Sequence, residues 1–397
     1  MPASKRLDEI YGDTKRHISV KSWGILFACI TYVCIFSLPG LLKGYSLWTD
    51  ELFTVAFINA PWREMFSQWI LQDVHPPLYF IFTKLWSLQF GISEVSLRTF
   101  SFIFSIGTVI ILWLWFQHEK KPRAFILLIL TISNPFFLYY SQEARSYSLL
   151  IFLCCLLTIA NLLQMERFRA EKVVPISKLS EFAMWLLYLA TSLTHFFGFL
   201  YAFTLLIINL SNQSYAGNKK YSCLTMASIM LWPSYHIGFV GGLGSTQKEQ
   251  ISHLATQQIW DPLYTYSLVN LPYTNSGKYW IDISICLALI AVILFYVGTI
   301  IGQKKALSEI YSVKQNWQQC KYGGQIIFIA LGVIIFVNTY SPVTTSRNLT
   351  ILIIATNLVI SAVLELIAFA DIKNRSLHAR IRKLSVIMFL AILFVVS

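Results

Sequence analysis

The chain carries acidic and histidine residues whose types and spacing suit proton transfer and anion binding. Asp50 and Glu51 are adjacent, and Asp73 and His75 follow within one short segment that ends in two prolines. A carboxylate can remove the proton of a hydroxyl nucleophile, whereas a histidine can donate to a phosphate oxygen or orient a carboxylate. We predict that Asp50 and Glu51 are catalytic, that His75 contacts an anion and that Asp73 supports it. A structural role also stays open for the acidic pair, because Thr49 can cap a helix whose first turn favours acids.

Later polar positions add arginines and a second histidine to this set. These positions are Glu143, Arg145, Tyr147, His195 and Arg347. A guanidinium can bind two phosphate oxygens at once and stabilise the charge on a departing phosphate. We therefore predict that Arg145 and Arg347 bind a phosphate, assisted by His75 and His195. Glu143 and Tyr147 are predicted to support the site. Structural alternatives are that the arginines snorkel at helix ends, that Glu143 only pairs with Arg145 and that His195 is a polar turn residue.

These residues must be positioned by membrane-spanning helices, because the rest of the chain is strongly apolar. Of its 397 residues, 56% are hydrophobic, 15% are aromatic and only 13% are charged. This composition is more apolar than a soluble domain needs. Apolar runs near the ~20 residues that cross a bilayer recur along the chain. We predict an all-α polytopic membrane protein with one domain over residues 1–397 and about eleven transmembrane helices. The predicted helices are Trp23–Leu42, Leu97–Phe116, Ala124–Tyr140, Ser146–Gln164, Phe182–His195, Phe196–Leu210, Tyr221–Val240, Trp280–Ile301, Gln325–Thr339, Leu349–Ala370 and Leu384–Ser397.

The basic residues predict how these helices are oriented. Most of the 31 lysines and arginines fall in alternate connecting segments, as the positive-inside rule requires of cytoplasmic loops. We therefore place the amino terminus in the cytoplasm and the polar groups at the extracytoplasmic face of the plasma membrane. The net charge of +12 is then a signal of orientation beside anionic membrane lipids. It does not indicate a nucleic-acid partner.

Two long extracytoplasmic loops are predicted. The first, residues 43–97, contains two apolar segments, Trp62–Gln72 and His75–Phe90, which we place as amphipathic helices in the membrane interface. Lys84 is expected to snorkel toward the headgroups. The second loop, residues 241–279, is rich in Gln, Ser, Thr and aromatic residues, which suit a donor or acceptor cleft. Its candidate contacts are Lys248, His253, Trp260 and Asp261.

Other chemistry is less well indicated. The seven cysteines lie in predicted spans or on the cytoplasmic side, so no disulfide framework is expected. No Gly-rich nucleotide cradle occurs, and activated nucleotides are cytosolic. A transferase acting at the outer face therefore needs a donor carried in the membrane, and a lipid-linked phosphate meets that requirement. Asp50, Glu51 and Asp73 could hold a divalent cation, but their spacing specifies no ligand set, and no other cofactor is indicated.

The residues of the first outer loop resemble a known family. Leu47-Trp48-Thr49-Asp50-Glu51, followed by DVHPPLY at residues 73–79, looks like the signature of GT-C-type membrane glycosyltransferases. It is most similar to bacterial relatives of the dolichyl-phosphate-mannose protein mannosyltransferases. Residues 141–147 (SQEARSY), Thr194-His195-Phe196-Phe197 and Ser346-Arg347-Asn348 also resemble that group. The resemblance implies inverting transfer of a sugar from a polyprenyl- or dolichyl-phosphate donor, with Asp50 as the catalytic base.

The expected function is therefore transfer of a hexose or pentose from a polyprenyl-phosphate donor to a hydroxyl of a glycan, lipid or protein. One alternative is a transporter or flippase of lipid-linked or anionic substrates, which would use the same charges for binding. Transporters usually show repeated halves and polar residues near the bilayer midplane, whereas these charges are predicted at one face and no repeat is seen. Another alternative is a membrane transferase that moves a different group, such as an amino-sugar or a phospholipid headgroup.

Overall fold

The computed structural model describes residues 20–43, 46–71, 73, 75–169, 177–211, 219–236, 311–340 and 350–369. No strand occurs among these residues, and the chain is an all-α protein. The helices are α2 (Val20–Leu42), α3 (Thr49–Asn59), α4 (Trp62–Glu64), the π-helix η1 (Met65–Ile70), α5 (Leu78–Phe90), α6 (Glu94–Glu119), α7 (Pro122–Ile132), α8 (Pro135–Tyr140), α9 (Tyr147–Arg169), α10 (Lys178–Ser192), α11 (Phe196–Ser211), α12 (Lys219–Tyr235), α17 (Tyr311–Tyr340) and α18 (Ile353–Phe369).

Three helices within the described ranges are long and apolar enough to cross a membrane. They are α2, α6 and the part of α9 from Tyr147 to Arg167. Shorter apolar helices occur at α7, α11 and residues 350–365. A backbone in lipid must satisfy its own hydrogen bonds, and helices do so within one segment. These helices and the composition of the chain make it an integral membrane protein.

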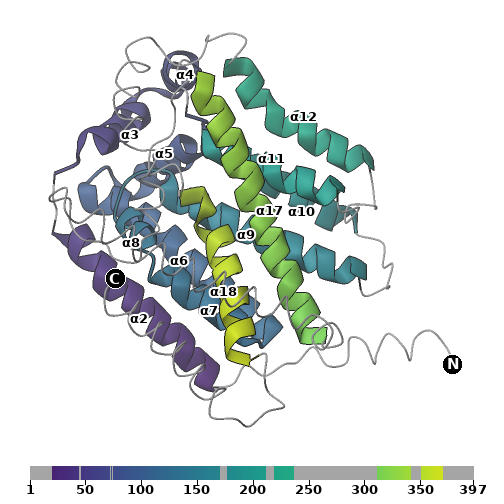
Figure 1. Cartoon of the computed structure of the whole chain (residues 1–397). Coiled ribbons are helices and arrows are strands. Elements are labelled where there is room, and N and C mark those ends of the chain that lie inside the picture. Colours follow the sequence, from purple (N-terminus) through teal and green to yellow (C-terminus); the bar gives the residue numbers. More distant parts are fainter. Residues whose placement is uncertain are drawn as a thin grey trace, which may run out of the picture.

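The long helices pack into one bundle, and the short helices of the first loop lie together at one end of it. In Figure 1, α3, α4 and α5 are at the top of the view, while α2 and α12 lie at opposite sides of the bundle. Helix α6 packs against α9 and α2, α18 packs against α17 and α7, and α5 packs against α3 and α6. The bundle therefore presents the first loop, and with it the sequence-predicted acids, at a single end.

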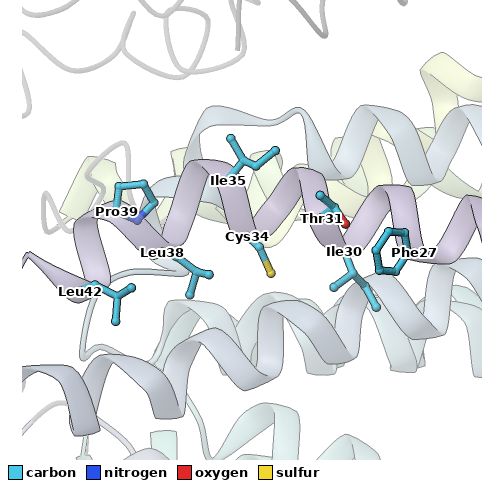
Figure 2. A pocket seen from close by; sticks show the side chains of 8 residues that line it. All are labelled: Phe27, Ile30, Thr31, Cys34, Ile35, Leu38, Pro39 and Leu42. Atoms are coloured by element: carbon cyan, nitrogen blue, oxygen red, sulfur yellow. The ribbon is translucent and has the colours of Figure 1, made fainter.

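The outer face of α2 is an apolar surface. A shallow groove of about 520 Å³ runs along this helix and is lined by Phe27, Ile30, Thr31, Cys34, Ile35, Leu38, Pro39 and Leu42. Figure 2 shows these side chains projecting from the helix, with Cys34, Leu38 and Leu42 along one side. Lipid tails are as apolar as leucine, so such a face suits contact with the hydrocarbon region.

A buried polar contact joins three helices of the bundle. The Tyr188 hydroxyl of α10 donates to Asn161 Oδ1 of α9 over 3.0 Å, and Asn209 Nδ2 of α11 donates to the Tyr188 oxygen over 2.9 Å. All three side chains are buried. Hydrogen bonds between helices in lipid contribute about 0.6–2 kcal/mol each, and they fix which helix faces meet. These bonds therefore fix the relative positions of α9 and of the two helices that flank His195.

Each predicted helix that falls on described residues overlaps an observed helix, although several bounds differ and one predicted helix is broken. Ala124–Tyr140 is divided at Asn134, whose side-chain oxygen accepts the backbone N–H groups of Phe136 and Phe137 over 3.0 and 3.2 Å. An asparagine cap followed by proline starts a new helix, α8, so the single predicted span is wrong. Gln325–Thr339 is the second half of the longer α17. Trp280–Ile301 and Leu384–Ser397 lie outside the described residues.

Helix α3 is fixed at both ends by side chains, and neither contact was predicted. The alternative in which Thr49 caps the helix is wrong, because α3 begins at Thr49, and Glu51 Oε2 instead accepts the backbone N–H of Trp48 over 3.3 Å. The predicted snorkelling of Lys84 is also wrong. Its ammonium is buried and donates to the carbonyl oxygens of Ile58 and Ala60, each over 2.6 Å. Lys84 therefore caps the carboxyl end of α3, where the helix dipole favours a cation.

We expect Lys84→Met to destabilise the protein by about 2–3 kcal/mol, because hydrogen bonds to a charged donor contribute about 1.5–3 kcal/mol and two carbonyl groups lose their partner. The apolar stem of lysine is retained by methionine, so little packing is lost. Thermal unfolding in detergent should show a lower Tm. Lys21→Met, at an exposed position of α2, is the matched control and should unfold like the wild type. An unchanged Tm for Lys84→Met would show that the α3 cap contributes nothing.

Candidate active site

Asp50 and Glu51 lie in the first turn of α3 but in different surroundings. Glu51 is fully buried, whereas Asp50 is half-buried. Successive residues of a helix point about 100° apart, so adjacent side chains need not share a face. The two acids predicted as catalytic therefore differ in access to a substrate, and Asp50 is the more accessible of the pair.

Glu51 is held by an arginine of α6 and by two backbone groups. Arg98 Nε donates to Glu51 Oε1 over 2.9 Å, and Arg98 Nη2 donates to Oε2 over 2.6 Å. The Ala144 N–H donates to Oε1 over 2.8 Å, in addition to the Trp48 N–H already described. Paired arginine and carboxylate groups in this geometry are among the strongest protein hydrogen bonds. Glu51 thus joins α3 and α6 to the loop that precedes α9.

Arg98 was given no role in the sequence analysis. One signal was available. Arg98 stands just inside the predicted span Leu97–Phe116 and on the side that the positive-inside rule leaves poor in arginine. An ionisable residue at such a position is usually paired or functional. Its partner could not be read from the sequence, since Glu51 lies 47 positions away.

Arg145 stands in the loop between α8 and α9, beside Asp50. Its Nη1 donates to the backbone oxygen of Asp50 over 3.0 Å, and its own carbonyl accepts the Ser101 hydroxyl over 3.3 Å. The residue is only 6% exposed. Within the described part of the chain, Arg145 Nε has no hydrogen-bond partner. A buried guanidinium with an unused donor is suited to an anionic ligand.

Asp73 and His75 form a pair. The His75 ring nitrogen Nδ1 lies 2.7 Å from Asp73 Oδ1, and the His75 backbone N–H donates to the same oxygen over 2.9 Å. Burial would raise the pKa of Asp73, but the His75 contacts and the Arg145 charge outweigh burial and lower that pKa below its usual value. Asp73 is therefore a carboxylate at neutral pH, and it fixes the orientation of the His75 ring.

Two further histidines and a tyrosine surround this pair. The His195 ring centroid lies 5.8 Å from that of His75 and 5.5 Å from that of Tyr147. His195 Nδ1 accepts the Phe197 N–H over 3.1 Å, so a neutral His195 carries its proton on Nε2. His236, which directly follows α12, contacts the backbone oxygen of Asp73 through its ring Nε2. His236 was not predicted, because it lies inside the apolar segment Tyr221–Val240.

The acidic and histidine groups form one cluster. The Phe53 ring of α3 lies 6.5 Å from the His75 ring, and the Arg145 charge lowers the pKa of Asp73. Glu143 is buried in the Arg145 loop, where its backbone oxygen accepts the Arg145 N–H over 2.8 Å. The structure therefore brings together eight of the residues named from the sequence, which are Asp50, Glu51, Asp73, His75, Glu143, Arg145, Tyr147 and His195. Arg347 and the loop 241–279 lie outside the described residues.

The sequence analysis left a divalent cation at Asp50, Glu51 and Asp73 as an open alternative. Among the residues for which the structure gives positions, no group of three or more His, Cys, Asp or Glu side chains is arranged to hold a metal ion. Asp50, Glu51 and Asp73, the acids named for this role, are not gathered into such a group, and Glu51 is occupied by Arg98.

No family model matches the chain, and no curated protein matches it. Among solved structures, the chain is similar to the crystal structure of ArnT from Cupriavidus metallidurans in the apo state, with a TM-score of 0.46 and 14% sequence identity. The similarity covers 87% of this chain, which spans only 60% of the length of that structure. We therefore base the function of this protein on the residues of its own site.

Proposed function

We propose that the protein is an inverting membrane glycosyltransferase that moves a sugar from a polyprenyl-phosphate donor to a hydroxyl acceptor at the extracytoplasmic face. The observation that supports this most is the position of Arg145, which is buried, is bonded to the backbone of Asp50 and has one donor without a partner among the described residues. The proposed base and the proposed phosphate-binding arginine therefore lie on contacting segments at one end of the bundle. Such a transfer requires both groups.

In the proposed reaction, Asp50 accepts the proton of the acceptor hydroxyl as its oxygen bonds to the anomeric carbon of the sugar. The bond between that carbon and the phosphate oxygen breaks, and its electron pair leaves with the polyprenyl phosphate. The leaving phosphate gains one negative charge, and Arg145 stabilises that charge. Attack opposite to the leaving group inverts the configuration at the anomeric carbon.

His75 and His195 suit contact with the other phosphate oxygens and the sugar of the donor. His195 presents Nε2–H as a donor when neutral, and His75 is oriented by Asp73. Both can donate to phosphate oxygens or sugar hydroxyls. Tyr147 is buried beside His195 and supports the position of that ring. Arg347, which the sequence analysis assigned to the phosphate, is proposed as a second cation in this role.

The proposal is tested by sugar transfer with the purified protein in liposomes. The donors are a panel of polyprenyl-phosphate sugars with a radiolabelled sugar, and the acceptors come from a host envelope extract. We expect one donor to be consumed while label appears in a new glycoconjugate. Hydrolysis of the donor by water, with no glycosylated acceptor formed, would contradict transfer to an envelope acceptor.

The transporter alternative predicts a different result in the same liposomes. A flippase moves labelled lipid-linked sugar across the bilayer and leaves its glycosidic bond intact. Movement of intact donor, with no cleavage in the presence of any extract, would overturn the proposed function and assign the charged cluster to transport.

A further inference from the structure

The Glu51 carboxylate has little capacity left for a substrate. A carboxylate offers about four lone-pair positions, and four donors approach Glu51 in this structure. These donors are Arg98 Nε, Arg98 Nη2, the Ala144 N–H and the Trp48 N–H, at 2.9, 2.6, 2.8 and 3.3 Å. Proton abstraction by Glu51 would require breaking at least one of these bonds in a fully buried place.

The bonds of Glu51 instead connect the two segments that carry the proposed chemistry. Glu51 directly follows Asp50, and its partner Ala144 directly precedes Arg145. A second bond supports the same connection, because the Thr54 hydroxyl of α3 donates to the Ala144 carbonyl over 3.0 Å. Both backbone groups of Ala144 are therefore bonded to α3, and Arg98 anchors this arrangement to α6 through Glu51.

We infer that the Arg98–Glu51 ion pair is a positioning pair, which sets the separation between the Asp50 carboxylate and the Arg145 guanidinium. This inference rests on the proposed function and assigns Glu51 a role other than direct catalysis. A transfer reaction is sensitive to this separation, because a displacement of about 1 Å between reacting groups can cost about 100-fold in rate. Loss of the Glu51 charge, or of the Arg98 fork that orients it, weakens the bond to the Ala144 N–H and allows the loop at residues 141–146 to move away from α3.

The first test compares Glu51→Gln and Arg98→Lys with matched controls in the same region. Glutamine keeps the shape of Glu51 without its charge, and lysine keeps the charge of Arg98 without its planar fork. The controls are Glu64→Gln, a partly exposed acid on α4, and Arg63→Lys, an exposed arginine beside it. We expect both site variants to lower kcat about 100-fold and to weaken polyprenyl-phosphate binding about 10-fold. The two controls should behave as the wild type.

A second measurement separates positioning from folding. Hydrogen–deuterium exchange of the peptide spanning residues 141–146 should become faster in Glu51→Gln, while α9 and α11 remain protected. Thr54→Val removes one bond to Ala144 without burying an unpaired charge, so it should fold normally. We expect Thr54→Val to change kcat and binding in the same direction as Glu51→Gln, by about 3- to 10-fold.

The outcomes distinguish this inference from the proposed function. Wild-type exchange of the 141–146 peptide in Glu51→Gln, or wild-type kcat and binding in the folded variants, overturns the positioning role while the transferase stands. The positioning role is also overturned if the activity of the variants falls only in proportion to the amount of folded protein. A wild-type protein that neither binds nor consumes any polyprenyl-phosphate sugar overturns the proposed function.

Discussion

Replacing Asp50 by asparagine should lower the rate of sugar transfer by about 10²- to 10⁴-fold, which is the usual contribution of general acid–base catalysis. Asparagine matches aspartate in shape but cannot accept the proton of the acceptor hydroxyl. The contact between Arg145 and this residue should survive, because Arg145 donates to the backbone oxygen of Asp50 and not to its carboxylate. Binding of polyprenyl phosphate should therefore remain within about threefold of the wild type.

The measurement is the initial rate of donor consumption by purified protein, together with the affinity for polyprenyl phosphate. Glu64→Gln serves as the control for loss of an acid in the first loop. A second role of Asp50 must be separated from catalysis, since an acid in the first turn of α3 stabilises that helix by about 0.3–1 kcal/mol. Thermal unfolding separates the role of Asp50 in catalysis from its role in the stability of α3. A nearly unchanged Tm with a lost rate indicates catalysis, whereas wild-type transfer by folded Asp50→Asn would refute Asp50 as the base.

The long helices could be predicted because their apolar runs approach the thickness of a bilayer. The predicted Trp23–Leu42 and the observed α2 end at the same residue. The interruption after α7 was missed, although Asn134-Pro135 combines a capping residue with proline at the first helical position. Hydropathy averages over such a dipeptide when apolar residues continue on both sides. The break was therefore encoded locally, and the overall hydrophobicity obscured it.

The grouping of these polar residues was predicted better than their individual contacts. Polar residues stood out against an apolar background, and the positive-inside rule assigned them to one face. Which side chains touch depends on the packing of helices far apart in sequence. Arg98 meets Glu51 across 47 positions, and His236 meets Asp73 across 163. Lys84 shows the same limit, because its partners are backbone carbonyls of α3, which leave no signal in the sequence.

Replacing Arg145 by glutamine should weaken polyprenyl-phosphate binding by about 10- to 100-fold and lower kcat by about 10²- to 10³-fold. The kinetic effect corresponds to the loss of one donor that stabilises charge developing on the leaving group. Arg145→Lys should give an intermediate result, because lysine keeps the charge but cannot bind two phosphate oxygens in a planar fork. The measurements are donor KM, kcat and equilibrium binding of polyprenyl phosphate.

The stability of Arg145→Gln discriminates between a ligand-binding and a structural arginine. A structural arginine makes bonds whose loss lowers the Tm, whereas an unused buried donor costs about 1–3 kcal/mol when no ligand is bound. Arg145→Gln loses the bond from Nη1 to the Asp50 backbone oxygen, but Arg145 Nε has no partner in the described residues, so we expect the ligand-free Tm to fall by only a few degrees. Polyprenyl phosphate should raise the Tm of the wild type through mass action and have little effect on the variant. A large drop in Tm without ligand, or an equal rise with it, would place Arg145 in the framework of the bundle and leave the phosphate to another cation.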